Sequence, residues 1–286
     1  MGKVYRLEVF VVVDNTAAEP GFAAEWGLSV YLRAYSEEDS VGVLFDFGQR
    51  GDTLLANLEA AGLGADKTPV LVLSHGHYDH AGGAVRFLEN TGTRPLLLAH
   101  PAAFLPKLGR KGGVLRDIGL PFPKRVLEEK ATLVETSSPV EVFDGVYFLG
   151  EIKRYGYPEY KKGMYTVLDG KVVEDPMLDD TGVAVNVEGL GLVVLTGCGH
   201  SGVLNVVRHA MEVTGVGELY AVLGGFHTEG AREEEVRRIV DTLCDWGASA
   251  LAPMHCSGSL IKFVAYEKEV LLDLGSGSSV AFEAKG

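Results

Sequence analysis

The sequence predicts an α/β protein in which two β-sheets pack face to face and helices cover their outer faces, an αββα four-layer sandwich. Two observations lead to this prediction. Segments of alternating or β-branched apolar residues run into helical segments in both halves of the chain. Polar residues follow directly after strand ends, where α/β folds usually place their chemistry. Because the 286 residues contain no low-complexity segment and no obvious linker, we assign residues 1–286 to a single domain.

The first half of the chain is rich in strands. We expect strands at 4–14, 28–35, 41–47, 70–73 and 95–99, and helices at 52–61 and 81–90. From about 104 to 130 glycine, proline and basic residues predominate, and we expect a loop or mobile insertion there. Strands resume at 131–134, 140–143 and 146–149.

The second half repeats the alternation of strands and helices. We expect strands at 183–187, 192–196, 219–223 and 250–253, and helices at 202–213 and 233–246. As in the first half, polar residues and residue types that bind metals come just beyond the strand ends.

Composition and charge exclude several classes of protein. Hydrophobic residues make up 47% and charged residues 23%, which is typical of a globular domain. No apolar run reaches the ~18 residues of a membrane helix, and the first residues predict a strand instead of a signal peptide, so we expect a cytoplasmic protein without a membrane partner.

Three cysteines argue against a disulfide framework and fit a reducing interior. The net charge of −13 disfavours nucleic acid as a partner. The sequence leaves the oligomeric state open, a homodimer included.

The run S-H-G-H-Y-D-H-A-G-G at 74–83 carries the strongest functional signal. It follows a buried strand and contains four residues of metal-binding type, namely His75, His77, Asp79 and His80. Alternate side chains of an extended segment point the same way, so His75 and His77 can reach one ion together. Asp79 and His80 follow a break in that alternation and can turn toward a second ion.

Four later strands also end in residues that bind metals or protons. These residues are Glu151, the pair Cys198 and His200, His227, and His255. Together with the first cluster they place six of the eight histidines at predicted strand ends. A single histidine in such a place is more often structural, whereas the group indicates a metal site. We expect the other two to be non-functional, with His100 structural and His209 on the surface of a helix.

These residues resemble the signature of the metallo-β-lactamase superfamily. The His-x-His-x-Asp-His run after a strand matches its main motif, and Asp46 and Gly48 match its early Asp-x-Gly motif beneath the metal site. The resemblance implies the αββα fold and one or two divalent metal ions. It also implies that His75 and His77 bind the first metal, and that Asp79, His80 and His255 bind the second.

Two positions depart from the superfamily pattern. Cys198 stands where most members have an aspartate that bridges the metals, and Glu151 stands where a third histidine of the first metal is expected. Cys198 is either a ligand or a small buried residue, and His200 is a candidate replacement for the missing histidine. A cysteine ligand favours zinc or iron. We expect zinc, with iron or manganese as alternatives.

The same departures resemble one branch of the superfamily. The segments around Cys198, His227 and His255 are similar to an archaeal and bacterial branch of metal-dependent hydrolases. That branch includes the methanopterin-pathway enzyme that joins a dihydropterin to ribofuranosylaminobenzene 5′-phosphate. Fold-level likeness transfers chemistry weakly, because one fold carries many reactions.

Residues for substrate and proton transfer are less sharply marked. The basic residues between 104 and 162 form either a solvated surface or an electrostatic funnel for a small anionic substrate. The tyrosines near 155–165 either pack or stack on a flat heterocycle. On the functional alternatives, Lys111, Arg154 and Tyr157 would bind substrate. The pair Asp179 and Asp180 either caps a turn or orients a metal-bound histidine, with Asp180 the preferred candidate for the second role. We place Asp79 and His227 in the catalytic machinery, with His227 as a general acid or a hydrogen-bond donor to substrate.

The preferred functional hypothesis is a metal-dependent hydrolase in which metal-activated water attacks a small anionic, phosphate-containing substrate. The first alternative is the methanopterin-type synthase, which would bind a reduced pterin and release pyrophosphate. A second alternative is an iron-dependent redox protein, suggested by the cysteine near the metals. A binding module without catalysis is the last alternative, and the complete ligand set argues against it.

Overall fold

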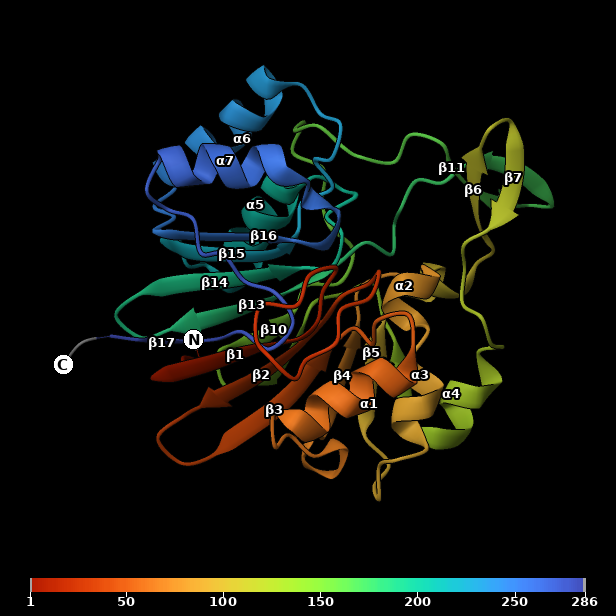
Figure 1. The fold of residues 1–286 in the computed structure, drawn as a ribbon, viewed down its shortest axis with the longest axis horizontal. Coiled ribbons are helices and arrows are strands. Elements are labelled where there is room, and N and C mark those ends of the chain that lie inside the picture. Colours follow the sequence, from red (N-terminus) through yellow and green to blue (C-terminus); the bar gives the residue numbers. More distant parts are fainter. Residues whose placement is uncertain (1, 285–286) are drawn as a thin grey trace.

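The computed structural model describes residues 2–284 and confirms the αββα sandwich (Figure 1). Two sheets pack face to face, and each carries helices on its outer face. The first sheet has the strand order β17 (Ser279–Glu283), β1 (Arg6–Val13), β2 (Ser29–Tyr35), β3 (Ser40–Phe45), β4 (Val70–Leu73), β5 (Leu96–Ala99) and β8 (Thr132–Glu135). Its helices are α1 (Gly51–Ala60), α2 (Tyr78–Ala81), α3 (Ala84–Leu88) and α4 (Arg125–Lys130).

The second sheet comes mainly from the second half of the chain. Its strand order is β16 (Ala250–Met254), β15 (Leu219–Gly225), β14 (Gly191–Thr196), β13 (Gly182–Val187), β10 (Val146–Phe148) and β9 (Val140–Phe143). Its outer face is covered by α5 (Val203–Thr214), α6 (Glu233–Asp245) and α7 (Ser259–Glu267), as Figure 1 shows. A glycine in the left-handed conformation, Gly215 (φ 66°), ends α5.

Three apolar cores hold the four layers together. The central core lies between the sheets and consists of side chains from the inner faces of their strands, for example Val43 from β3 and Val185 from β13. The alternate residues Leu44 and Ala184 point outward to the helices. Because both faces of the inner strands are covered, their sequences read as nearly continuous apolar runs.

Parallel strand pairs place the functional loops at one edge of each sheet. Strands β3, β4, β5 and β8 run parallel in the first sheet, and β14, β15 and β16 run parallel in the second. The segments that follow β4, β14, β15 and β16 carry the histidine run and the later candidate ligands. Chain segments far apart in sequence therefore meet at the carboxyl ends of these strands.

A third, four-stranded sheet projects from the side of the sandwich, with the order β12 (Lys171–Glu174), β11 (Met164–Leu168), β6 (Lys107–Lys111) and β7 (Val114–Asp117) (Figure 1). Of the loop or mobile insertion expected over about 104–130, the irregular loop was wrong, because this range contains β6, β7 and α4, whereas the mobile insertion stays a prediction. The hairpin turns at Gly112 and Gly113, both with positive φ, and every residue of β7 is exposed. A strand exposed on both faces needs no alternation of apolar residues, so the pattern gave no signal.

Within residues 2–284, no helix is long and apolar enough to span a membrane.

Candidate metal centre

The histidine run begins where β4 ends. His77 has an extended backbone and the short helix α2 begins directly after it, so Asp79 and His80 lie beyond a break in the alternation, as the sequence predicted. Gly76 lies so close to a neighbouring loop that a Cβ there would be 2.0 Å from the carbonyl oxygen of Ala103. The bare glycine backbone lets His75 and His77 approach the same point.

One group of candidate ligands consists of His75, His77 and His200. One side-chain nitrogen from each lies within 4.8 Å of the others, and all three residues are buried. The Nε2 atoms of all three are buried without a hydrogen-bond partner. On His200, Nδ1 lies 2.8 Å from the carbonyl oxygen of Tyr160 and must donate to it, which leaves Nε2 as a free acceptor.

The electrostatics of this group favour neutral rings. Burial, reinforced by the neighbouring imidazoles, holds the pKa of His75 and of His200 well below the usual value. Burial lowers the pKa of His77 to about 4. Neutral imidazoles with unpartnered buried nitrogens fit a divalent metal ion, which would satisfy all three atoms at once.

A second group consists of Asp79, His80 and His255, whose ligand atoms also lie within 4.8 Å of one another. The Nε2 atoms of His80 and His255 are 3.2 Å apart, and His255 Nε2 is 3.4 Å from Asp79 Oδ2. Trp26 Nε1 donates to the same Asp79 oxygen at 2.9 Å. Two imidazoles and a carboxylate that converge in this way also fit a divalent cation.

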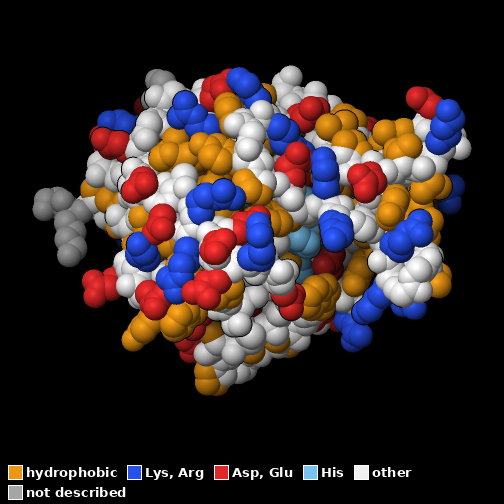
Figure 2. All heavy atoms as spheres, turned by 90° about the horizontal axis from the view of Figure 1, so that it is seen from above, with side chains coloured by type: hydrophobic (Ala, Val, Ile, Leu, Met, Phe, Trp, Pro, Cys, Tyr) orange, Lys and Arg blue, Asp and Glu red, His pale blue; other side chains and the backbone are white. Residues whose placement is uncertain are grey.

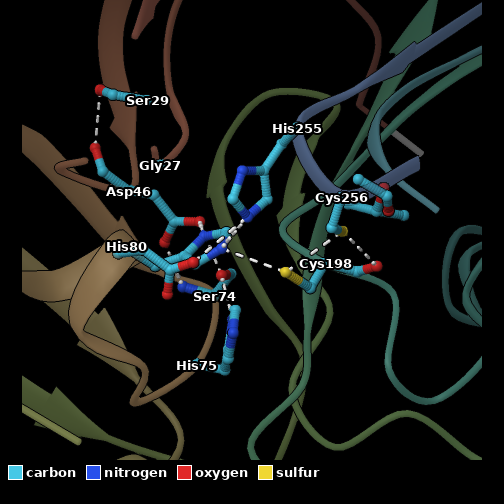
Figure 3. A network of polar contacts seen from close by, with 12 residues as sticks. Gly27, Ser29, Asp46, Ser74, His75, His80, Cys198, His255 and Cys256 are labelled. Carbon is cyan, nitrogen blue, oxygen red and sulfur yellow. Dashed lines mark hydrogen bonds and ion pairs between the residues drawn. The ribbon is translucent and has the colours of Figure 1, made fainter. Parts of the chain in front are cut away.

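Asp46 holds His80 of the second group in place through hydrogen bonds. Its Oδ2 accepts from His80 Nδ1 at 2.7 Å and from the hydroxyl of Ser74 at 2.6 Å, while Oδ1 accepts from the Ser74 amide at 2.7 Å (Figure 3). Burial lowers the pKa of His80, but the Asp46 carboxylate outweighs burial and raises it to about 9. Because Asp46 fixes the proton on Nδ1, the other ring nitrogen faces the ligand group.

Cys198 lies between the two groups. Its Sγ is 3.2 Å from His80 Nε2 (Figure 3). Cys198 belongs to one candidate group with His75 and His80 and to another with His200 and His227. A thiolate in this place could contact both ions, which is the place that an aspartate bridge would take.

A buried lysine supports the histidine run from the other side. Lys107, at the start of β6, is 1% exposed and donates to Asp175 at 3.0 Å and to Asp179. The second oxygen of Asp179 accepts from the Gly76 amide at 2.9 Å. This chain of contacts fixes the backbone between His75 and His77 through the root of the projecting sheet.

Comparison with known proteins decides the family. The family model described as the metallo-beta-lactamase superfamily matches residues 29–207, more than half of the chain. The chain belongs to the metallo-β-lactamase superfamily. A solved structure described as Tm1679, a metal-dependent hydrolase of the beta-lactamase superfamily, superposes with a TM-score of 0.81 and 25% identity, over 97% of this chain and all of that one.

Two curated relatives come from Methanocaldococcus jannaschii. The 7,8-dihydropterin-6-methyl-4-(beta-D-ribofuranosyl)-aminobenzene-5′-phosphate synthase is 26% identical and aligned over 99% of both chains. An uncharacterized protein is 33% identical over 87% of this chain and 90% of its own length. The resemblance of this metallo-β-lactamase superfamily member to the branch that contains the synthase is thereby confirmed.

Several predicted site residues lie outside the two ligand groups. Glu151 is exposed at the end of β10, with Oε2 3.4 Å from His100 Nε2, and it joins no candidate ligand group among the described residues. Asp180 accepts from the amide and hydroxyl of Ser201, so it steadies the loop that carries His200, and within residues 2–284 no hydrogen bond joins it to a histidine ring. Asp46, by contrast, hydrogen-bonds directly to the ring of a candidate ligand, His80.

The three predicted substrate residues have other surroundings. Arg154 donates to the carbonyl oxygens of Ile152, Pro176 and Met177, and Tyr157 packs edge-on against Trp246. Lys111 is exposed on the projecting hairpin. The expectation that His209 lies on the surface was wrong, because it is 8% exposed and its Nε2 lies 3.1 Å from the carbonyl oxygen of Leu149. His100 Nδ1 accepts from the Ala102 amide, a structural contact.

Three residues that shape the centre were not predicted as part of it, namely Trp26, Lys107 and Cys256. Cys256 follows His255 directly, so its position beside a candidate ligand could have drawn notice. Lys107 lies in a basic run whose other members are solvated, and composition alone cannot single it out.

Proposed function

We propose that this protein is a metal-dependent hydrolase acting on a small anionic substrate. The observation that carries the proposal is the triad of buried histidines whose Nε2 atoms converge without a hydrogen-bond partner. Three buried acceptors without donors are costly unless a cation satisfies them. His75, His77 and His200 would hold one ion, and Asp79, His80 and His255 a second, with Cys198 between them.

A divalent metal ion held by these residues would lower the pKa of a water molecule toward ~7, which would make hydroxide available near neutral pH. The chain's own residues orient the reactants. His227 lies beside His200, with ring centroids 4.3 Å apart, and it lines a pocket of about 390 Å³. It can therefore donate a proton or a hydrogen bond to a group bound in this pocket.

Charge around the opening supports an anionic substrate only in part. Figure 2 shows a histidine side chain at the bottom of a hollow, with both basic and acidic side chains on its rim. Lys162 lines the pocket beside His227, as do Glu159 and Glu235. Glu159 pairs with Arg154 and Lys161, and Glu235 accepts from the Tyr160 hydroxyl. The exposed Lys162 ammonium is the group we expect to attract the substrate.

The synthase is the second candidate. It is supported by the 26% identity that extends over 99% of both chains. The name of this relative describes a product that is both a pterin and a phosphate, which is compatible with a small anionic ligand.

The two candidates are separated by metal and substrate experiments on the same preparation. Elemental analysis of protein purified without chelator gives the metal, and turnover of a panel of phosphate esters is measured before and after EDTA. We expect EDTA to abolish turnover, and His77→Ala to remove metal and turnover together. His209→Gln is the matched control, since His209 lies outside both ligand groups, and it should keep both. Full activity in metal-free protein refutes the proposal. Binding of a reduced pterin in calorimetry, without ester hydrolysis, selects the synthase.

A further inference from the structure

Two cysteines face each other at the centre. Cys198 follows β14, and Cys256 lies in the short 3-10 helix His255–Ser257 after β16. Their Sγ atoms are 3.4 Å apart, and the Cys256 thiol also lies 3.6 Å from the carbonyl oxygen of Cys198 (Figure 3). The remaining cysteine, Cys244, lies in α6 and is less buried than the other two.

The backbone around the pair is built for this approach. A Cβ on Gly225 would lie 2.8 Å from Cys256 Sγ and 3.0 Å from Cys198 Cα, so no other residue fits there without displacing the pair. A disulfide needs an S–S distance of about 2.0 Å, and each sulfur would move by less than ~1 Å to reach it. Rotation of the two side chains can supply a movement of this size.

Closing this bond would change the metal centre. Cys198 Sγ is 3.2 Å from His80 Nε2 and is shared by the two ligand groups, so a sulfur bonded to Cys256 is no longer available as a thiolate ligand. Cys256 sits next to His255, so the closure also pulls on a ligand of the second group. Both effects weaken the hold on a metal ion.

We propose that Cys198 and Cys256 are a reversible redox modification site, whose disulfide withdraws a sulfur ligand and releases metal. The oxidant is hydrogen peroxide. One thiolate sulfur attacks a peroxide oxygen, which breaks the O–O bond and gives a sulfenic acid and one water after proton uptake. The second thiol sulfur attacks the sulfenic sulfur and expels a second water. The two thiols lose two electrons and two protons, and peroxide is reduced to two waters.

The burial of both cysteines favours a small oxidant. Cys198 and Cys256 are 3% and 5% exposed, so a peroxide can reach them more readily than a bulky disulfide reagent. A reducing compartment keeps the pair as thiols, and the bond forms only when peroxide accumulates. The effect on metal rests on the proposed metal-dependent function, whereas formation of the bond does not.

The experiment uses the full chain, metal-free and zinc-loaded, treated with hydrogen peroxide. We expect a mass loss of about 2 Da and a peptide that links Cys198 to Cys256. Zinc affinity should fall at least about tenfold, as it does when an outer-shell partner of a metal is lost. Dithiothreitol should restore both mass and affinity. Cys244→Ser is the matched control and should behave as the unaltered protein, while Cys256→Ser should form no link and keep zinc after peroxide. Circular dichroism checks that each variant is folded.

The failures can be told apart. If metal-free protein forms no Cys198–Cys256 link, or links through Cys244, the proposal is overturned whatever the enzyme does. If the link forms and zinc affinity is unchanged, the release of metal is overturned. If untreated protein never binds zinc or another divalent metal, the proposed function fails, and the mass and the linked peptide still decide whether the redox site exists.

Discussion

Lys107→Met tests the buried network beneath the histidine run. The lysine is 1% exposed, and its ammonium contacts two carboxylates that are 3% and 0% exposed, Asp175 and Asp179. Methionine keeps most of the volume of the side chain and removes only its charge and donors. The variant therefore leaves two buried carboxylates facing each other without a cation.

The expected loss of stability follows from that imbalance. Removal of one partner from a buried ion pair costs about 3–5 kcal/mol, because the other charge stays buried and uncompensated. Here two carboxylates lose their cation, so we expect a loss of at least ~3 kcal/mol in the free energy of unfolding. The second oxygen of Asp179 still accepts from the Gly76 amide. Repulsion between the two carboxylates that displaces Asp179 would therefore also displace the backbone between His75 and His77. We expect metal affinity to fall about 10–100-fold as well.

The same network predicts a pH dependence. Burial would raise the pKa of Asp179, but the Lys107 ammonium and the Gly76 amide outweigh burial and hold it below its usual value. A lowered folded-state pKa contributes stability that is present above the unfolded pKa and is lost as the pH falls through the folded value. The Lys107 pKa is raised, since the two carboxylates outweigh burial, so its contribution is lost as the pH rises through the folded value. The variant should lack both dependences, and its loss of stability relative to the unaltered protein should shrink at acid pH, where the uncompensated Asp179 carboxylate becomes protonated.

Urea unfolding followed by circular dichroism measures the loss of stability, and zinc titration measures the loss of affinity. Lys111→Met is the matched control, because Lys111 is exposed on the same strand and its substitution should change stability by less than ~0.5 kcal/mol. A change below ~1 kcal/mol for Lys107→Met, together with unaltered zinc affinity, would show that the network neither stabilises the fold nor positions the histidine run.

Two further predictions concern the ligand groups. Asp46→Asn removes the charge that holds the His80 proton on Nδ1, and zinc titration should show a metal affinity about 10–100-fold lower. The control variant Asp52→Asn changes an exposed carboxylate and should leave the metal affinity unchanged. Gly76→Ala places a Cβ 2.0 Å from a backbone oxygen, and should cost at least ~1–3 kcal/mol and release metal. Gly92→Ala meets nothing within 4 Å and should change neither quantity, so equal effects from the two glycine variants would contradict the steric argument.

The buried sheets could be predicted from the sequence because burial imposes a pattern. The strands expected at 70–73 and 140–143 match β4 and β9 residue for residue, and the helix expected at 233–246 matches α6 to within one residue. The projecting sheet was missed because its strands are solvated or pack on one side only, so they need no continuous apolar run. The helix α7 and the strand β17 were not predicted for the same reason, because exposed residues interrupt their apolar pattern.

The candidate ligands could be predicted because a strand end fixes where a side chain points. Strand geometry brings residues after β4 and β16 to one edge, and so His75 and His255 fall into neighbouring groups although 180 positions separate them in the chain. The partners that hold those rings were harder to foresee. Asp46 was marked by a motif, whereas Lys107 reaches the site only through a carboxylate and a backbone amide, and this contact depends on how the projecting sheet is rooted.

Cys198 shows why a departure from a family pattern must be judged in three dimensions. From the sequence alone, a cysteine in place of a bridging aspartate can be either a metal ligand or an inert buried residue. Its sulfur lies within contact of His80 on one side and of Cys256 on the other, so the first alternative gains support and a redox partner appears that no spacing in the sequence indicates. A carboxylate bridge can only bind or release protons. A thiolate bridge can also be oxidised, and a second thiol 3.4 Å away gives that oxidation a reversible product.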